Sequence, residues 1–309
     1  MISVPASIDA TGATDVTAAL NAFVAGVPNG STIVFPAGGK YLLGQGIQLA
    51  NRSGLTFEGN GTTLSVSPSV SGENLTSLFI LGHRYGGYWT GTDSNITIRN
   101  FTLVGNSTTP GVYQPGMEYQ NGVQVEDSSS VLLDNLTIRS VWGDGVRIGG
   151  TSNGVVFRDS HVQSAGRNGA TVSAGRNITI ERVAFDKSGY VTFDVEPNYS
   201  YEVASNITFR DNTAGTWSDS FFAANYPPGS TVSDVTISGN TVTGDSLYSY
   251  VTLQRRQNIV FTNNRSMVTA AGPVLRFAHV DGLTVTGNVQ PLSSGSLASI
   301  SDCTGVIVQ

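Results

Sequence analysis

The sequence is poor in cysteine, in lysine and in charge. Cys303 is the only cysteine among 309 residues, so no internal disulfide can form. Lys40 and Lys187 are the only lysines, and the formal net charge is −6. We therefore expect no nucleic acid as a partner, because neutralising phosphates needs a basic surface. No run of 18 apolar residues occurs, so we expect no membrane-spanning segment.

What the sequence has in abundance is a short strand motif, two apolar strand formers separated by one residue. It begins at Leu55, Ile96, Val131, Val155, Ile178, Ile207, Val235, Ile259, Leu283 and Val306. The intervals are 41, 35, 24, 23, 29, 28, 24, 24 and 23, which is a coil period of 23–24 residues with insertions. A coil of this length cannot bury its apolar row alone, but coils stacked at about 4.8 Å can. The repeat predicts an all-β fold, a single-stranded right-handed parallel β-helix of about ten coils.

Two further rows support this register. The residue after the motif alternates in sign through six coils: Glu58, Arg99, Asp134, Arg158, Glu181 and Arg210. Opposite charges stacked at coil spacing attract, so we expect a charge ladder. Two residues further on stand Asn60, Asn212, Asn240, Asn264 and Asn288. Asparagine tolerates left-handed turns and can bond to the coils above and below, so we expect an asparagine ladder.

The ends of the chain differ from its middle. The segment from Asp15 to Val24 has the pattern of a short amphipathic α-helix, which would cap the open end of the solenoid. We therefore predict one domain over 1–309, with a cap helix and the first strands in 1–50 and coils in 51–309. No cap is visible at Val306–Gln309, so we expect either that the chain is truncated there or that another chain covers that end, as in a homo-oligomer such as a trimer.

A second strand recurs between the repeats and carries the candidate chemistry. If Val123, Val125, Phe193 and Val195 point inward, two rows of side chains point outward. The first row is Gln124, Arg147, Thr171, Asp194, Phe222 and Thr252, and the second is Glu126, Gly149, Ser173, Glu196, Ala224 and Gln254. Asn121, Asp144, Asn168 and Asp219 precede these strands on the same face.

Asp194 and Glu196 are the leading catalytic candidates. They are two residues apart on one strand face, so their backbone positions lie about 6.5–7 Å apart. Two carboxyl groups this close push one pKa upward, and such a pair is how glycoside hydrolases divide acid and base roles. No basic residue is expected beside Glu196 in the stack. The alternative is a solvated pair of acids on a strand.

Asp144 and Asp219 are further catalytic candidates, although Asp in Gly-Asp-Gly is often only a turn residue. Arg147 and Arg167 would bind a sugar acid or orient a carboxylate, unless they form surface ion pairs. The insertions fall near 82–94, 106–120, 197–205 and 225–233 and are rich in aromatic residues, namely Tyr85, Tyr88, Trp89, Tyr113, Tyr119, Tyr199, Tyr201 and Tyr226. Aromatic rings with a polar edge suit sugar rings, but loops packing on the wall would explain some of them. The residues expected to bind substrate are Glu126, Trp142, Arg147, Arg167, Asn168, Tyr190, Tyr199, Trp217 and Arg255.

These motifs resemble the pectate-lyase-like right-handed β-helix superfamily, which contains pectinase-type enzymes and phage tailspikes. Its opening motif is similar to Ile8-Asp-Ala-Thr-Gly-Ala-Thr-Asp-Val-Thr-Ala-Ala-Leu, followed by Thr32-Ile-Val-Phe-Pro-Ala-Gly and Tyr41. This chain lacks the first and third acids of that motif. Of the polygalacturonase signatures it keeps part of one, Gly143-Asp-Gly-Val-Arg-Ile148. The resemblance implies a carbohydrate-active protein whose partner is a polysaccharide or oligosaccharide.

Three functions stay open. The first is a glycoside hydrolase that uses Asp194 and Glu196 and needs no cofactor. The second is a polysaccharide lyase that acts on a uronic acid, with Arg147 or Tyr190 as base and calcium held by carboxylates. The third is a non-catalytic glycan-binding protein of a phage tail or a cell surface. His83, His161 and His279 are scattered, so they suggest no metal site or triad.

The location follows from the same resemblance. No signal-peptide pattern follows Met1, which leaves a mature secreted chain, a cytoplasmic product or a virion protein released by lysis. We expect an extracellular location or a phage virion, because polysaccharides are found outside the cell.

Overall fold

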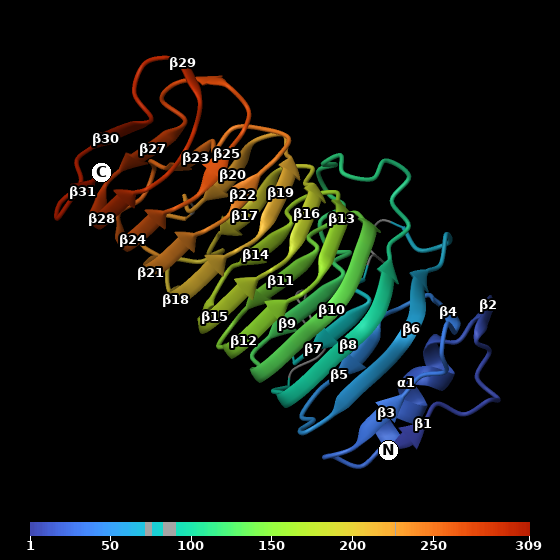
Figure 1. Cartoon of the computed structure of the whole chain (residues 1–309). Coiled ribbons are helices and arrows are strands. Elements are labelled where there is room, and N and C mark those ends of the chain that lie inside the picture. The colour runs from blue at the N-terminus through green and yellow to red at the C-terminus, as the bar shows by residue number, and fades with distance from the viewer. Residues whose placement is uncertain (72–75, 83–90, 226) are drawn as a thin grey trace.

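The computed structural model describes residues 1–71, 76–82, 91–225 and 227–309. Its strands stack along one axis from the N-terminus to the C-terminus (Figure 1). Almost all of them belong to a 19-stranded sheet or to a ten-stranded sheet, and the paired neighbours run parallel. The predicted parallel β-helix is therefore confirmed.

The 19-stranded sheet forms two walls, which we call walls one and two. Three long strands belong to both: β6 (Thr56–Val66), β8 (Ser94–Val104) and β10 (Ser129–Val141). The other strands of wall one are β1 (Ile2–Ser3), β3 (Thr32–Val34), β12 (Asn153–Arg158), β15 (Gly175–Glu181), β18 (Val203–Arg210), β21 (Thr231–Ser238), β24 (Arg256–Thr262), β28 (Val280–Thr286) and β31 (Ile307–Val308). Those of wall two are β2 (Thr11–Asp15), β4 (Lys40–Leu43), β13 (His161–Ala165), β16 (Ala184–Lys187), β19 (Thr213–Thr216), β22 (Thr241–Val242) and β25 (Arg265–Ser266).

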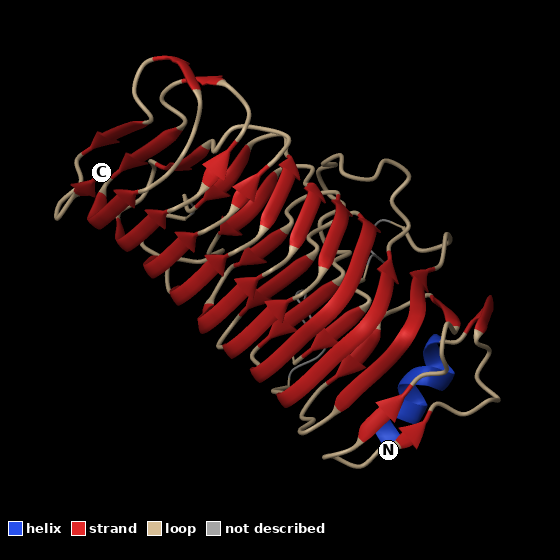
Figure 2. Ribbon diagram, viewed as in Figure 1, coloured by secondary structure: helices blue, strands red, loops and turns tan. Residues whose placement is uncertain are grey.

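The ten-stranded sheet forms wall three, which carries the candidate site. Its strands are β5 (Ile47–Leu49), β7 (Phe79–Leu81), β9 (Val123–Glu126), β11 (Val146–Gly149), β14 (Ala170–Val172), β17 (Val191–Val195), β20 (Ser220–Ala223), β23 (Ser249–Val251), β27 (Leu275–Ala278) and β30 (Ala298–Ser301). A two-stranded sheet, β26 (Ala270–Ala271) with β29 (Leu292–Ser294), lies near the C-terminus. Figure 2 shows how strands dominate the structure and how loops project from it.

The core follows from the period-two alternation of the strands. In β18, Ile207 and Phe209 are fully buried, whereas Thr208 between them is partly buried and Arg210 after them is exposed. Aromatic rings then stack inside the solenoid, because successive coils bring Phe193 within 4.5 Å of Phe209 and 5.9 Å of Phe222, measured between centroids. Stacking therefore fills the core with the same residue type in neighbouring coils.

The charge ladder on wall one is confirmed. Glu58 pairs in register with Arg99, and each later member pairs with an opposite charge up to Arg210. Ion pairs join Arg99 to Glu58 at 2.7 Å and Arg158 to Asp134 at 3.3 Å. Exposed pairs of this kind contribute at most about 1 kcal/mol each, so the ladder mainly selects the register.

The asparagine ladder exists over four coils, from Asn212 to Asn288. In Asn240, the side-chain amide donates to the Phe209 carbonyl at 3.1 Å and to Asn264 Oδ1 at 2.8 Å. The expected fifth member, Asn60, is separate and donates to the Phe35 carbonyl. We expected these asparagines to adopt the left-handed turn, and this is wrong for the four ladder members. Among the five asparagines, Asn60 alone has a positive φ, 50°. In the ladder the residue before each asparagine turns instead, for example Asn263 with a φ of 56°.

The predicted cap helix is α1 (Thr17–Gly26), which buries Leu20 and Val24. Asp15 accepts a hydrogen bond from the Thr17 amide at 2.9 Å, as expected at a helix start. At the other end, the Arg52 guanidinium donates to the Val24 carbonyl at 2.8 Å. In the part of the chain that the structure describes, no helix has the length and apolar character to cross a membrane.

We expect Asn240→Ala to destabilise the protein by about 2–3 kcal/mol, because it leaves buried polar groups of neighbouring coils without partners. Denaturant unfolding measures the loss. Asn153→Ala is the control: Asn153 is exposed and accepts one side-chain hydrogen bond from Asn177. Its loss should stay within about 0.5 kcal/mol. Equal losses in both variants would show that the ladder has no special importance.

Candidate active site

The outward rows of wall three hold through four coils. Gln124, Arg147, Thr171 and Asp194 pair in register on β9, β11, β14 and β17. Beyond β17 the predicted row is wrong: Asp194 pairs with Ala223, and Ala223 pairs with Tyr250. The reason is that Phe221 and Phe222 are both buried, so this strand has no alternation to define its register.

The second row has a narrow floor. Gly149 pairs with Glu126, and Ser173 and Glu196 each follow a paired valine by one residue in the next two coils. A Cβ atom at Gly149 would lie 2.4 Å from Glu126 Oε2 and 2.6 Å from Ser173 Oγ. A side chain at Gly149 would therefore have to displace the Glu126 carboxylate or the Ser173 hydroxyl.

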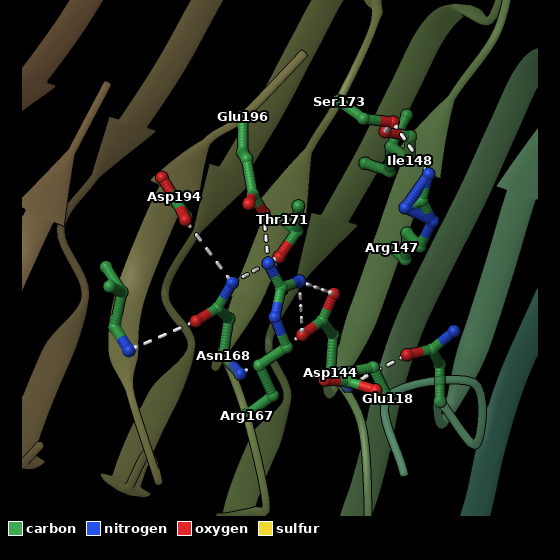
Figure 3. Close-up of polar contacts among 12 residues, drawn as sticks. Glu118, Asp144, Arg147, Ile148, Arg167, Asn168, Thr171, Ser173, Asp194 and Glu196 are labelled. Atoms are coloured by element: carbon green, nitrogen blue, oxygen red, sulfur yellow. Dashed lines mark hydrogen bonds and ion pairs between the residues drawn. The ribbon is translucent and has the colours of Figure 1, made fainter. Parts of the chain in front are cut away.

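Arg167 lies between three of the four predicted acids (Figure 3). Its guanidinium lies 3.3 Å from Asp144 Oδ2 and forms a short ion pair with Glu196 Oε2. The expectation that Glu196 has no basic partner is therefore wrong. Arg167 stands in the turn before β14, outside the rows, and its long side chain reaches across coils. Asp144 and Glu196 thus share one cation. The sequence alone did not show this bridge.

Asp194 of β17 and Glu196, which directly follows that strand, occupy different environments. Asp194 is 6% exposed, whereas the Glu196 side chain is 27% exposed. Burial, and then the nearby Glu196 carboxylate, raise the pKa of Asp194 well above its usual value, although Arg167 opposes the shift. Burial acts to lower the pKa of Arg167, but Asp144, Glu196 and Asp194 outweigh it and raise that pKa. Burial and the neighbouring carboxylate thus favour the protonated form of Asp194, beside a permanently charged guanidinium.

Asp144 belongs to a buried polar column. Its amide donates to Asn121 Oδ1 at 2.8 Å, and its own Oδ1 accepts from the Asn168 amide at 3.1 Å. The Asn168 side chain then donates to Thr171 Oγ1 at 2.9 Å and lies 3.5 Å from Asp194 Oδ2. The column therefore orients both Asp144 and Asp194, and Asn168 connects them.

Asp219 lies outside this column, contrary to the prediction. Its amide donates to the Tyr190 carbonyl at 3.0 Å, so it follows Arg167 and Tyr190 in the stack. The Tyr250 hydroxyl donates to Asp219 Oδ2 at 2.8 Å. The insertion before β20 shifts the coil by one position, which the sequence pattern did not show.

One inserted loop crosses the wall. We call residues 106–120 the strap. Tyr113 of the strap stacks on Tyr190 with ring centroids 5.5 Å apart, and its hydroxyl donates to Glu118 Oε1 at 2.8 Å. Gly111 approaches the Lys187 side chain so closely that a Cβ atom would lie 2.6 Å from Cδ. The strap thus reaches coils well beyond its own and presents Glu118 to the site.

A pocket of about 280 Å³ lies between the strap and the loop after β17. It is lined by Tyr113, Glu118, Tyr119, Asn121, Gln124, Asp144, Arg147, Arg167 and Asn198. Glu118 and Asn198 were not predicted, and the insertions that carry them were the only signal in the sequence. The buried Asn198 Nδ2 has no hydrogen-bond partner among the described residues. Asn198 thus lines the pocket, while its amide nitrogen is buried behind the pocket surface.

Glu126 and Arg147 form a second pair beside the pocket. Arg147 Nε lies 3.5 Å from Glu126 Oε1, and Arg147 Nη2 donates to Ser173 Oγ at 3.2 Å. Burial raises the pKa of Glu126 to about 7, although Arg147 acts to lower it. Glu126 is 6% exposed, so it is placed to hold Arg147 at the pocket and is covered from solvent.

Three predicted substrate contacts are not supported by the structure. Trp142 is 6% exposed, belongs to the core and donates to Asn106 Oδ1 at 3.0 Å, so it anchors the strap. Trp217 packs against the core near Phe221. Arg255 forms ion pairs with Asp281 and Asp302 in the last coils. Their apolar or charged side chains suggested binding from the sequence. In the structure the two tryptophans pack on the core and the arginine is paired with carboxylates.

The remaining loop aromatics divide into two groups. Tyr199 is 46% exposed and stacks on Tyr201 at 5.2 Å, on the loop that follows Glu196. It stays a predicted substrate contact. Tyr85, Tyr88, Trp89 and Tyr226 lie outside the described residues.

We expect Arg167→Met to destabilise the protein by about 3–5 kcal/mol at pH 7, because it leaves buried carboxylates without a counter-charge. The loss should shrink at acid pH, because a neutral carboxyl group needs no counter-charge. Thermal unfolding across pH measures this. Arg158→Gln, in the exposed charge ladder, should cost about 1 kcal/mol or less. A pH-independent loss for Arg167→Met would contradict the charge argument.

Comparison with solved structures finds this fold over nearly the whole chain. The N-terminal fragment of gene product 12 of bacteriophage Phi29 is 15% identical, with a TM-score of 0.63, covering 97% of this chain and 56% of that one. An endo-xylogalacturonan hydrolase from Aspergillus tubingensis is 15% identical, with a TM-score of 0.58, covering 97% and 94%. The surface adhesin PfbA of Streptococcus pneumoniae is 12% identical, with a TM-score of 0.56, covering 99% and 91%. At these identities the likeness shows the fold alone.

Comparison with curated proteins finds no match by sequence. Family models do match. One described as right-handed β-helix region covers residues 144–304, which confirms the predicted handedness. Another, described as rhamnogalacturonase A/epimerase, pectate lyase-like, covers residues 5–217. The chain therefore belongs to this carbohydrate-active, pectate-lyase-like family of right-handed β-helix proteins.

Proposed function

We propose that this protein hydrolyses glycosidic bonds of a polysaccharide or oligosaccharide on wall three. The observation that carries the proposal is the contrast between two acids on one strand face. Asp194 is buried and has a raised pKa, whereas Glu196 is more exposed and bound to Arg167. Carboxyl groups whose environments separate them in this way mark the acid and the base of a hydrolytic pair.

The roles follow from these environments. Protonated Asp194 donates its proton to the glycosidic oxygen, and the bond from that oxygen to the anomeric carbon breaks. Glu196 either takes a proton from the attacking water or attacks the anomeric carbon itself. The charge left on Asp194 is stabilised by Arg167 and by the nearby Asn168 amide.

Asp144 acts through Arg167 in this proposal. It lies 3.3 Å from the guanidinium and is held by the Asn168 amide. It would therefore position Arg167 between the acids. Asp219, bound by Tyr250, lies close enough to raise the pKa of Asp194 further.

The lyase alternative has less support. Of the two bases proposed for it, Tyr190 has a pKa raised by burial and by Asp219, so its phenol stays protonated. The other, Arg147, is paired with Glu126. Calcium does not fit the cluster well, because Asp144 and Glu196 already face a guanidinium that would repel a cation. Within the described ranges, no three His, Cys, Asp or Glu side chains are grouped to hold a metal. Ultraviolet-absorbing unsaturated products would favour the lyase.

We propose an extracellular or virion location and a homo-oligomeric assembly. The structural neighbours include a phage protein and a surface adhesin, which supports an extracellular or virion location. A homo-oligomer such as a trimer fits the same setting, and size-exclusion chromatography with light scattering would test it.

We expect Asp194→Asn and Glu196→Gln each to lower reducing-sugar release by at least about 100-fold, because each removes one proton-transfer group. The assay uses a panel of neutral and acidic polysaccharides with the wild-type chain as reference. Asp234→Asn is the matched control: Asp234 is exposed on wall one and has asparagine neighbours, Asn206 and Asn258, in the stack. Full activity of both site variants would exclude this pair as the catalytic acids.

The same Asp194→Asn variant should be more stable than the parent at neutral pH. Because the folded-state pKa of Asp194 is raised, its protonated form is fully stabilising only below about pH 4, and stability falls as pH rises toward the folded pKa. Asparagine removes that loss. Melting temperatures should therefore coincide near pH 3.5 and diverge above it. A variant that is less stable at neutral pH, with the difference vanishing at low pH, would mean that Asp194 is held as a carboxylate.

A further inference from the structure

Carboxyl groups outnumber cations around the pocket. Two line it, Glu118 and Asp144, and three more lie directly behind the cations that line it: Glu126, Asp194 and Glu196. The cations are Arg147 and Arg167 alone among the pocket-lining residues. The lining itself is balanced, with two carboxylates against two guanidiniums, so the negative surplus comes from Glu196 behind Arg167 and from the ionised fraction of Glu126.

Both arginines are already bound to carboxylates. Arg167 is shared between Asp144 and Glu196, and its own side chain is only 15% exposed. Arg147 pairs with Glu126 and donates to Ser173. An incoming carboxylate would have to displace a protein carboxylate that is positioned in advance, which removes most of its advantage.

One of the two lining carboxylates, Glu118, belongs to the strap. Burial opposes ionisation of Glu118, but the hydrogen bond from Tyr113 and the charge of Arg167 lower its pKa below the usual value. Glu118 is therefore ionised at neutral pH. A second carboxylate brought into this pocket would be repelled by it.

The other residues of the pocket lining are uncharged. Asn198 Nδ2 is a buried donor without a hydrogen-bond partner among the described residues. Gln124 and Tyr113 add an amide and a phenol to the lining, and Tyr119 adds a ring that is 51% exposed. Sugar hydroxyls both donate and accept, so they can bind these groups and the carboxylates together.

We propose that the wall-three site accepts an uncharged glycan and discriminates against sugars that carry a carboxylate. The inference rests on the proposed function, since it names the substrate class of the same site. It differs from the polyuronate reading of the lyase alternative. The physical basis is a pocket with a surplus of negative charge. Its two cations, Arg147 and Arg167, are each already paired with carboxylates of the protein.

The test is a glycan array that holds neutral glycans and glycans bearing uronic or sialic acids, probed with the whole labelled chain. We expect the retained glycans to be neutral, with an affinity that changes less than about twofold between low and high salt. Retention of acidic glycans, with an affinity that falls as salt rises, would overturn the inference. If those acidic glycans were also hydrolysed, the proposed function would still hold. No retained glycan and no hydrolysis would overturn both.

A charge variant sharpens the test. Glu118→Gln keeps an oxygen that can accept from Tyr113 but removes the charge. Against polygalacturonate and its carboxyl-reduced form, it should bind the charged polymer about tenfold more tightly than the parent does, with little change for the reduced polymer. Asp234→Asn, remote from the pocket, should leave both affinities unchanged. An unchanged preference in Glu118→Gln would mean that pocket charge does not select the substrate.

Discussion

The stacking of parallel coils is the constraint on which the whole structure depends. Each residue of a coil lies about 4.8 Å from its counterparts above and below, so every chemical feature is repeated along a column. Repeated phenylalanines fill the core, and repeated asparagines bond to one another. Repeated charges of one sign would repel, so wall one alternates them. Each column is stable only if its residues tolerate their own neighbours.

Wall three departs from this rule around Asp194. Three carboxyl groups, on Asp144, Asp194 and Glu196, come close together across neighbouring coils, and one guanidinium compensates them. Such a cluster costs stability in a scaffold that elsewhere pairs its charges. Reactive groups are expected where a protein accepts that cost, because perturbed acids are useful in catalysis. The further excess of acid at the pocket explains why the same site would favour an uncharged ligand.

The insertions convert a flat wall into a pocket. The strap spans several coils and docks through close contacts of its backbone with Lys187 and Gly189, where a side chain at Gly111 or Gly189 would collide. It carries Glu118 and Tyr113 to residues far along the axis. The loop after β17 supplies Asn198 from the other side. A rigid solenoid with long loops thus separates the tasks of stability and recognition.

The sequence by itself determined the solenoid, its period and most of its register, because an in-register stack leaves its spacing and alternation in the chain. It also placed Asp194 and Glu196 on one face, since both lie on one regular strand. The prediction failed where the repeat is irregular. The register was wrong at the adjacent phenylalanines of β20 and at Asp219, which follows an insertion. Trp142 was expected to bind substrate, but its ring is packed in the core. Only the tertiary structure decided that Arg167 bridges the acids and that the strap brings Glu118 to them. Those contacts join residues in different coils through a long arginine side chain and a long loop. No local sequence pattern encodes which distant residues such a side chain or loop will contact.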